Sequence, residues 1–371
     1  MEKGEQSVPF TTSRSHEQSQ SKKSKNIDTL LVINPTSSSG STGKGWDNLY
    51  VKIKDIFGKN SQIVFTKQAN DGTMLTRKFL KKGVKKVFAI GGDGTINEVA
   101  NGFFMPERKQ DDKKKQQQVP FPTKNVGGQN NRSDFPKPDT LMPINPETIF
   151  GIIPSGTRNV LARSLSLPQE IDECCHNYLK GGTKKIDVLT TTVTNPITRS
   201  KGPTRAFLNA AEIGFGAEVI DRSKKVRNRV KSRIVSTITS VIATLPTYES
   251  NNCEIVFDDG KDKVLTKMTM GVIANGKFLG GGFMAAPEAS FSDGLLDVVI
   301  LTDSSSIKML DKLASIKTGN HTDEFDVIYK QVRKVSIKSL ERDITVAIDG
   351  EPIGILPGTF QVNPYPLNIL L

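Results

Sequence analysis

The sequence predicts an α/β protein in which a Rossmann-like α/β domain precedes a mostly antiparallel β-sandwich domain. Three observations lead to this fold class. Short apolar runs alternate with helix-length segments over about the first 168 residues. After Lys184, strand-like runs follow one another with a single helical interruption. A chain of 371 residues is also long enough to bury two separate cores.

In the N-terminal half, strand and helix segments alternate in the order typical of a parallel sheet covered by helices. Strands are expected at residues 30–33, 63–65, 84–90 and 148–153, and helices at 46–56, 70–82, 96–104 and 157–165. We assign residues 27–168 to this domain, after a polar tail at 1–26 that is expected to be disordered. Residues 106–146 show no periodicity and are expected to form a flexible insertion.

The C-terminal half is expected to be rich in β-structure. Strands are predicted at residues 186–194, 205–211, 253–258, 266–274, 296–301, 332–336 and 344–348, with one helical interlude at about 218–245. Many short strands without intervening helices favour an antiparallel sandwich or barrel. We assign residues 169–351 to a substrate or lid domain, and expect residues 352–371 to return toward the first domain.

Charge and composition restrict the function classes. The net charge is +12, which favours an anionic partner such as nucleic acid, a membrane surface or a phosphorylated ligand. Nucleic-acid signatures are missing, so a nucleotide or a membrane fits better. The sequence has no apolar run of 18 residues and no signal-peptide pattern, and we therefore expect a cytoplasmic protein. Its three cysteines and three histidines lack metal-ligand spacing.

A glycine-rich turn carries the strongest chemical signal. The strand at 84–90 runs into Gly91, Gly92, Asp93, Gly94 and Thr95, and a helix follows. Glycines let the backbone approach a phosphate closely, and the N–H groups at a helix N-terminus attract anions. The spacing fits neither a Walker loop nor the Rossmann fingerprint. Taken alone, the turn is explained equally well as an ordinary strand-to-helix connection.

Two further loops follow strand ends in the same domain. One is Asn34-Pro35 with Ser38, and the other is the segment 154–159. In an open parallel sheet, neighbouring strand ends meet at one crevice, so the three loops are expected to line one site.

Residues spread over nearly all of 28–371 match one known family in order. The motifs are Asn34-Pro35 with Ser38 and Gly40, Gly91–Thr95 with Asn97-Glu98, Pro154–Asn159 with Ala162-Arg163, Phe207 and Asn209 with Gly214–Gly216, Asn275-Gly276, Gly280–Gly282 with Ala286-Pro287, Asp293–Val298 and Asp349–Glu351. Together they resemble the catalytic domain of diacylglycerol kinases, a family that includes sphingosine, ceramide and bacterial lipid kinases. The resemblance implies the fold shared with NAD kinases, ATP and Mg²⁺ as cofactors, and a lipid alcohol as the acceptor.

The resemblance also implies the residues that contact ATP. They are Asn34, Pro35, Ser38, Thr66, Gly91, Gly92, Asp93, Gly94, Thr95, Asn97, Glu98, Gly156, Thr157 and Asn159. Asp93, Asp349 and Glu351 are implied as catalytic residues, with Glu351 as the proton acceptor. A carboxylate in that role suits phosphoryl transfer to an alcohol. Strand alternation would place Asp349 and Glu351 on one face if the strand stays regular. The segment by itself favours a hairpin turn by roughly three to one.

Similar bacterial kinases imply a structural Mg²⁺ site at Asp293, with the carbonyls of Ser290 and Leu295 as further ligands. Oxygen ligands with few carboxylates suit magnesium. An Asp-Gly turn without metal explains this segment nearly as well. Val160 departs from the family pattern, in which many members carry aspartate, and this puts a diacylglycerol-specific assignment in doubt.

A basic cluster opens the helical interlude. Lys224, Lys225, Arg227 and Arg229 precede an apolar stretch, which suits docking on an anionic membrane. A solvated helix face is the competing interpretation. We therefore expect a cytoplasmic lipid kinase that is peripheral at the inner face of the membrane. NAD kinase and an inactive nucleotide- or lipid-binding homologue are the alternatives, and the acceptor lipid and a homodimer are left open.

Overall fold

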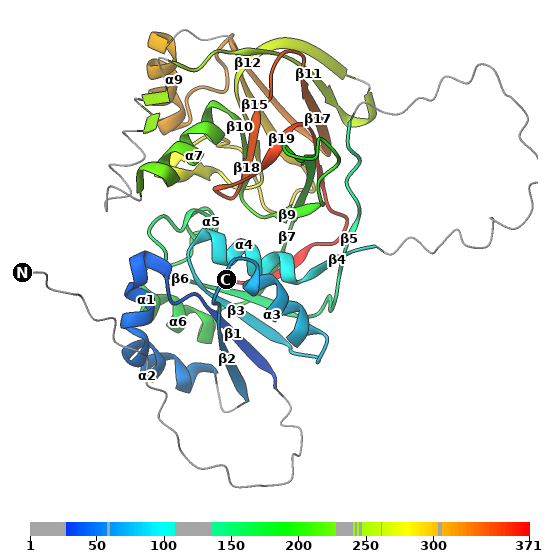
Figure 1. The fold of residues 1–371 in the computed structure, drawn as a ribbon. Coiled ribbons are helices and arrows are strands. Elements are labelled where there is room, and N and C mark those ends of the chain that lie inside the picture. The colour runs from blue at the N-terminus through cyan, green and yellow to red at the C-terminus, as the bar shows by residue number, and fades with distance from the viewer. Residues whose placement is uncertain are drawn as a thin grey trace, which may run out of the picture.

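The structure, a computed structural model, consists of two domains stacked end to end (Figure 1). It describes residues 27–57, 60–107, 135–227, 247–260, 262–302 and 306–371, together with 240, 241, 243 and 244. The expected tail at 1–26 and most of the expected insertion at 106–146 lie outside the described residues.

The first domain is built on a six-stranded sheet that is parallel except at one edge. Its strand order is β2-β1-β3-β6-β20-β7, and only the β20–β7 pair is antiparallel. The bounds are β1 (Thr29–Ile33), β2 (Ser61–Phe65), β3 (Lys86–Gly91), β6 (Ile149–Pro154), β20 (Leu367–Leu370) and β7 (Thr183–Ile186). Continuous apolar runs form the central strands because helices cover both faces of a parallel sheet.

The helices of this domain pack in pairs. The helix α3 (Asp71–Leu80) contacts α4 (Asp93–Gly102), and α2 (Trp46–Phe57) contacts α6 (Ile171–Lys180). Two short helices, α1 (Ser41–Lys44) and α5 (Val160–Ser164), follow loops at the carboxyl ends of the strands. A small hairpin of β4 (Phe104–Pro106) and β5 (Leu141–Pro143) flanks the sheet.

The second domain is an antiparallel β-structure that closes on itself. The path β10-β18-β19-β17-β11-β12 returns to its start because β10 also pairs with β12. Its interior holds an apolar cluster that includes Phe207, Ile255 and Phe360. The bounds are β8 (Leu189–Thr194), β9 (Arg205–Phe207), β10 (Ala210–Gly214), β11 (Asn251–Phe257), β12 (Asp262–Ala274), β15 (Leu296–Thr302), β16 (Val327–Val332), β17 (Lys334–Ser339), β18 (Thr345–Ile348) and β19 (Glu351–Val362).

A second apolar layer lies outside this closed sheet. It is covered by α7 (Phe215–Arg227), α9 (Ser306–Thr318) and a hairpin of β13 (Phe278–Leu279) and β14 (Phe283–Met284), joined by the 3-10 turn η5 (Gly280–Gly282). A further 3-10 turn, η1 (Ser37–Gly40), lies in the first domain, and η4 (Asp258–Gly260) joins β11 to β12.

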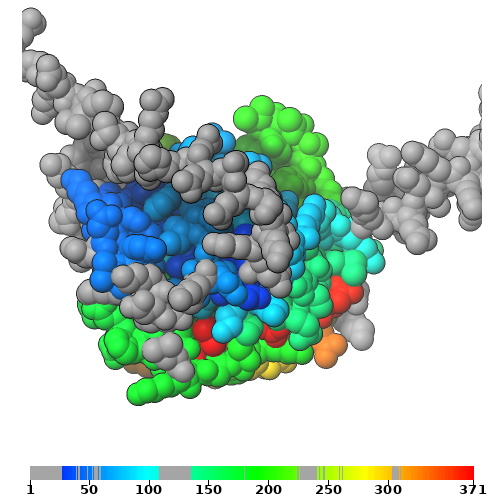
Figure 2. All heavy atoms as spheres, turned by 90° about the horizontal axis from the view of Figure 1, so that it is seen from below, coloured from blue at the N-terminus to red at the C-terminus, as the bar shows by residue number. Residues whose placement is uncertain are grey.

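The chain crosses between the domains more than once. After the second domain, β20 returns to the first sheet and pairs with β6 and β7. Figure 2 shows the red C-terminal atoms at the surface beside cyan and green atoms of earlier segments. The first sheet is thus completed by residues that follow the whole second domain.

The fold class predicted from the sequence is confirmed, and the differences are local. The prediction of a single helical interlude after Lys184 is wrong, because α9 is also a helix. The strands expected at 186–194 and 205–211 each divide in two. The helix expected from Ile96 begins instead at Asp93, because Gly92 is extended (φ −91°, ψ −175°) and acts as its N-cap.

Candidate active site

The glycine turn between β3 and α4 is tightly packed. An added Cβ on Gly91 would lie 2.6 Å from the Thr95 side chain, so only glycine fits there. Asp93 and Gly94 form the first turn of α4, where unpaired N–H groups and the helix dipole favour an anion.

The second turn, after β6, packs directly against the first. A Cβ on Gly156 would lie 2.4 Å from Gly92 Cα and 2.6 Å from Asn159 Oδ1. Asn159 takes a left-handed conformation (φ 47°), and its Oδ1 accepts a hydrogen bond of 2.9 Å from the Gly156 amide. The two turns therefore meet backbone to backbone.

The loop after β1 completes the same edge of the sheet. Asn34 Nδ2 donates to Thr95 Oγ1 at 2.9 Å, and Ser38 Oγ donates to the Ser155 carbonyl at 2.9 Å. These bonds join three strand-end loops, which sequence reasoning expected to converge.

A cleft of about 550 Å³ opens between these loops and the second domain. Predicted residues that line it are Asn34, Ser38, Gly92, Asp93, Gly94, Thr95, Asn97, Glu98, Gly156, Thr157, Asp349 and Glu351. Four other predicted residues, Pro35, Thr66, Gly91 and Asn159, are not among its lining. Thr66 Oγ1, for example, donates to the Ile33 carbonyl at 3.4 Å.

Hydrogen bonds of Asp349 connect the second domain to the first. Its Oδ1 accepts from the amides of Asn209 and Ala210 at 2.9 and 3.1 Å. Its Oδ2 accepts from the Leu208 amide at 3.0 Å and from Asn97 Nδ2, on α4, at 2.7 Å. Burial raises the pKa of Asp349, while these four donors favour its ionised form and oppose that rise. With both oxygens engaged, Asp349 is suited to positioning.

Asp349 and Glu351 do not share one face of a regular strand, because the strand does not continue through Gly350. The hairpin turn that the segment by itself favours is the one that forms. Asp349 and Gly350 both have positive φ, 46° and 81°, and form the two-residue turn between β18 and β19. Such turns require positive φ at both central residues. The turn sends the Asp349 carboxylate into the protein, whereas Glu351 is exposed. A Cβ on Gly94 would lie 3.4 Å from Glu351 Oε1, so Glu351 faces the glycine turn.

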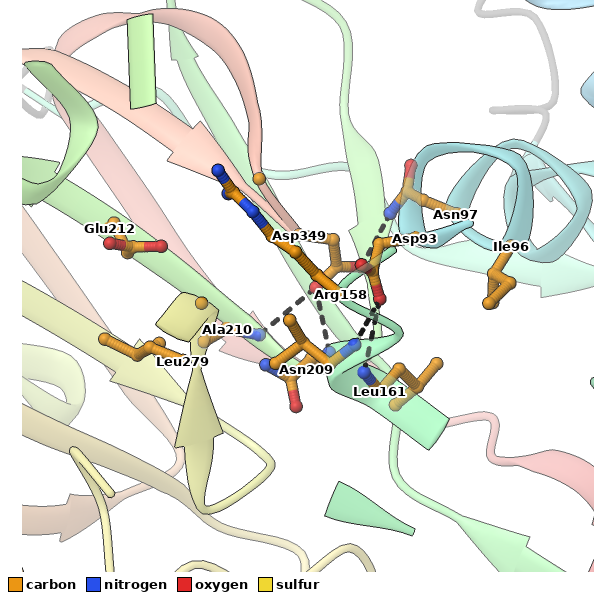
Figure 3. Close-up of a pocket in the computed structure, with 13 residues that line it drawn as sticks. Asp93, Ile96, Asn97, Arg158, Leu161, Asn209, Ala210, Glu212, Leu279 and Asp349 are labelled. Atoms are coloured by element: carbon orange, nitrogen blue, oxygen red, sulfur yellow. Dashed lines mark hydrogen bonds between the residues drawn. The ribbon is translucent and has the colours of Figure 1, made fainter. Parts of the chain in front are cut away.

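Asp93 connects the glycine turn to α5. Its Oδ1 accepts from the amides of Val160 and Leu161 at 2.7 and 3.3 Å (Figure 3). Burial raises the pKa of Asp93 above its usual range, opposed by these two amides and by the charge of Arg158. Val160 thus meets Asp93 through its backbone amide, which any residue except proline supplies.

Glu98 has a local structural role at the cleft wall. Its two carboxylate oxygens accept from the amides of Asn70 and Gly72 at 2.9 and 3.0 Å, which satisfies N–H groups at the start of α3.

Sequence reasoning missed Arg158 and Glu212. Figure 3 shows Arg158 extended between Glu212 on one side and Asp93 with Asp349 on the other. Arg158 directly follows the predicted residue Thr157, so its position in the turn could have been predicted from the sequence. No motif marks Glu212, whose position depends on strand pairing in the second domain.

The predicted metal loop at Asp293 is organised by hydrogen bonds. Asp293 Oδ1 accepts from the Leu295 amide at 3.0 Å, and Asp187 Oδ2 accepts from the Gly294 amide at 2.8 Å. Among the described residues, no group of three His, Cys, Asp or Glu side chains could hold a metal. The set of Asp293 with the carbonyls of Ser290 and Leu295 stays a prediction.

The basic cluster is only partly described. Lys224, Lys225 and Arg227 lie on α7, and Arg229 lies outside the described residues. Lys225 is exposed and pairs with Asp221 at 2.6 Å. In the part of the chain that the structure describes, no helix is long and apolar enough to span a bilayer.

Comparisons with known proteins agree with the two-domain division. Residues 28–191 match the model of the diacylglycerol kinase catalytic domain, and residues 209–371 match the YegS C-terminal NAD kinase beta sandwich-like domain. The chain belongs to the diacylglycerol kinase family. A diacylglycerol kinase of Bacillus subtilis is 24% identical over 337 residues, covering 90% of this chain and 93% of the relative.

Other members of the diacylglycerol kinase family show the same extent of similarity. A YegS-like lipid kinase of Chromohalobacter salexigens is 26% identical over 80% of this chain and 78% of its own. The crystal structure of a diacylglycerol kinase from Bacillus anthracis superposes with a TM-score of 0.61 at 20% identity, covering 92% of this chain and 96% of that one. This likeness shows the fold.

Proposed function

We propose that this member of the diacylglycerol kinase family is an ATP-dependent lipid kinase. It transfers the γ-phosphoryl group of ATP to a hydroxyl of a lipid alcohol. The observation that carries the proposal is the facing of two elements across one cleft: the glycine turn at Gly94 and the carboxylate of Glu351. A phosphate-binding turn opposite a proton acceptor is the arrangement that phosphoryl transfer to an alcohol needs.

The first domain supplies the donor side. Amides of the two glycine turns and the N-terminus of α4 bind phosphate oxygens, and the absence of Cβ atoms at Gly92 and Gly156 lets the backbone come close. Arg158 and Arg205 line the cleft and offset phosphate charge. Asn34 and Ser38 fix the third loop against these turns.

The second domain supplies the acceptor side. Glu351 takes the proton of the lipid hydroxyl as its oxygen bonds to the γ-phosphorus, while the bond from that phosphorus to the β-γ bridging oxygen breaks and ADP leaves. Asp349 holds the turn that carries Glu351 in register with α4. Asp349 is therefore a positioning residue in this proposal, and Glu351 is the catalytic one.

The donor set at the cleft fits Mg²⁺. Of the two carboxylate oxygens of Asp93, only Oδ1 accepts hydrogen bonds from described residues. This leaves Oδ2 available beside the Glu351 carboxylate and the phosphate site. Mg²⁺ is commonly held by one or two carboxylates together with substrate phosphates and water. When bound, the ion would neutralise charge on the β- and γ-phosphates.

Two observations support a lipid as the acceptor. The relatives that match along the chain are named diacylglycerol kinase and lipid kinase. In addition, an apolar pocket lined by Phe215, Val219, Met270 and Leu313 adjoins the cleft through Arg158. That pocket suits the part of an acyl chain nearest the head group.

A phosphotransfer screen tests the proposal. The purified protein is given labelled ATP, Mg²⁺ and a panel of lipid alcohols in mixed micelles, with NAD included. We expect phosphorylated lipid with the wild-type protein and a loss of about 100-fold or more in kcat for Glu351→Ala. Phosphorylation of NAD without lipid would instead identify a NAD kinase. Binding of ATP and lipid without any transfer would indicate an inactive homologue.

A further inference from the structure

Glu212 occupies an unusual position in the second domain. It lies in the middle of β10, opposite Val272 of β12 and Ala347 of β18. Its neighbours Ala211 and Ile213 point into the interior of the closed sheet. By strand alternation Glu212 faces the outer apolar layer, together with Ala210. An acidic side chain there costs folding free energy unless something compensates it.

The protein itself provides little compensation. Within the described residues, no hydrogen-bond donor reaches the Glu212 carboxylate, and Arg158 is the charged group that acts on it. Burial raises the pKa of Glu212 to about 7, and the charge of Arg158 opposes this rise. The carboxylate lies beside Gly216, because a Cβ added to Gly216 would be 2.8 Å from Glu212 Oε2.

Glu212 also lines two cavities that adjoin the large cleft. It lines a small cavity of about 40 Å³ together with Asp93 and Asp349 (Figure 3). It lines the apolar pocket of about 70 Å³ as well, and Arg158 is common to both of these and to the large cleft. A ligand that fills the apolar pocket from the phosphate site therefore lies against Glu212, which lines that pocket.

We propose that Glu212 selects the acceptor by accepting a hydrogen bond from a second donor group of the lipid, a hydroxyl or an amine next to the hydroxyl that is phosphorylated. This rests on the proposed lipid kinase function. Diacylglycerol has a single donor, its reacting hydroxyl, since its ester oxygens only accept. A monoacylglycerol carries a second hydroxyl, and a sphingoid base carries an amine.

The charges around the small cavity agree with such a donor. Three carboxylates line it, Asp93, Asp349 and Glu212, against one cation, Arg158. Asp93 and Asp349 are engaged by backbone and side-chain donors, whereas Glu212 is not. A ligand donor placed at Glu212 would satisfy the acid that the fold leaves without one.

The test uses the full chain and lipids of equal acyl length. Initial rates give kcat/KM for a diacylglycerol, a 1-monoacylglycerol and a sphingoid base in mixed micelles. We expect wild type to prefer one of the two-donor lipids over diacylglycerol, and Glu212→Gln to lower kcat/KM for that lipid about 10- to 100-fold. The rate with diacylglycerol should stay within about twofold. A preference for the 1-monoacylglycerol identifies a hydroxyl as the second donor, whereas a sphingoid base carries a second hydroxyl as well as its amine.

Two controls separate selection from a structural effect. Glu218→Gln changes an acid on α7 that lines none of these cavities, and it should leave all three rates unchanged. Glu212→Met, of similar size but apolar, should abolish the preference in the same way as Gln. An equal loss with all lipids, or an unchanged preference, would overturn the proposal.

A binding measurement makes the outcome independent of turnover. Calorimetric titration with short-chain analogues of the three lipids reports affinity without ATP. A Glu212-dependent preference in binding with no transfer would support the acceptor site and refute the kinase function. Transfer to lipids without any Glu212-dependent preference would refute the acceptor site and support the kinase.

Discussion

The two walls of the cleft are built from different material. The wall from the first domain has two backbone turns at its centre, where Gly92 and Gly156 are in contact. The second domain contributes carboxylates whose positions depend on strand pairing, Asp349 and Glu351 at the cleft and Glu212 in the adjoining cavities. A backbone wall suits a constant ligand such as a phosphate chain, while side chains can be exchanged to suit different acceptors.

The largest expected effect is on stability, for a substitution of Asp349, which connects the two domains. Asp349→Asn puts an NH₂ group where amide donors converge, so at least one buried donor loses its partner. We expect a loss of about 3 kcal/mol in the free energy of unfolding, measured with urea. Asp343→Asn, at an exposed pair with Arg199, should cost under about 1 kcal/mol. Full stability combined with lost turnover would make Asp349 a reacting group instead.

The half-buried acid Glu212 of the second domain should have the opposite effect on stability. Its pKa of about 7 in the folded protein exceeds the usual 4.5, so ionisation disfavours the folded state. Glu212→Gln should therefore leave stability unchanged below pH 4.5, gain progressively up to pH 7, and gain about 3 kcal/mol above it. Unfolding midpoints across this pH range, beside Glu218→Gln, measure the effect. A loss at every pH would indicate that Glu212 stabilises the fold.

A Gly-to-Ala substitution tests whether the two glycine turns bind phosphate. In Gly156→Ala the new Cβ collides with Gly92 Cα and Asn159 Oδ1, which should separate the two turns. We expect a cost of about 2 kcal/mol and a higher KM for ATP. Gly182→Ala is the matched control, because no atom lies within 4 Å of its added Cβ. An unchanged KM for ATP would argue against phosphate binding between the turns.

The smallest effect per residue is expected outside the cleft. Reversing the charges of Lys224 and Lys225 should weaken co-sedimentation with anionic vesicles by about 1 kcal/mol per residue. Reversal of Lys78, exposed on α3, and of Lys81, exposed at the C-cap of that helix, serves as control. Equal binding of both variants and wild type would refute docking through α7.

The same contrast explains what the sequence could predict. The strand-to-helix turns at Gly91–Thr95 and 154–159 are local, so their residues and spacing were sufficient to place them at one edge of a sheet. Asp349 was found only through the family resemblance, and its four partners come from segments at 97 and 208–210. Glu212 was not predicted as a site residue. An acidic residue in a strand indicates no function until the pairing of that strand shows which layer the side chain faces.

Local patterns were correct at one segment and insufficient at another. At Asp349-Gly350 the local pattern favoured a hairpin turn, and this turn forms, with Glu351 at the start of the next strand. The helix α9 was missed, although its apolar residues Met309 and Ile316 are buried in the outer layer. Tertiary packing decides such a helix where local propensity is ambiguous.

The position of β20 has a consequence for how the chain folds. Because β20 lies between β6 and β7, the first sheet has a gap until Leu367–Leu370 have left the ribosome. During synthesis the edges of β6 and β7 are then unpaired strand templates, which makes this stage sensitive to mispairing. The long sequence separation between β6 and β20 also predicts slow final closure of the sheet. The first domain would thus be finished last, after the second domain has been made.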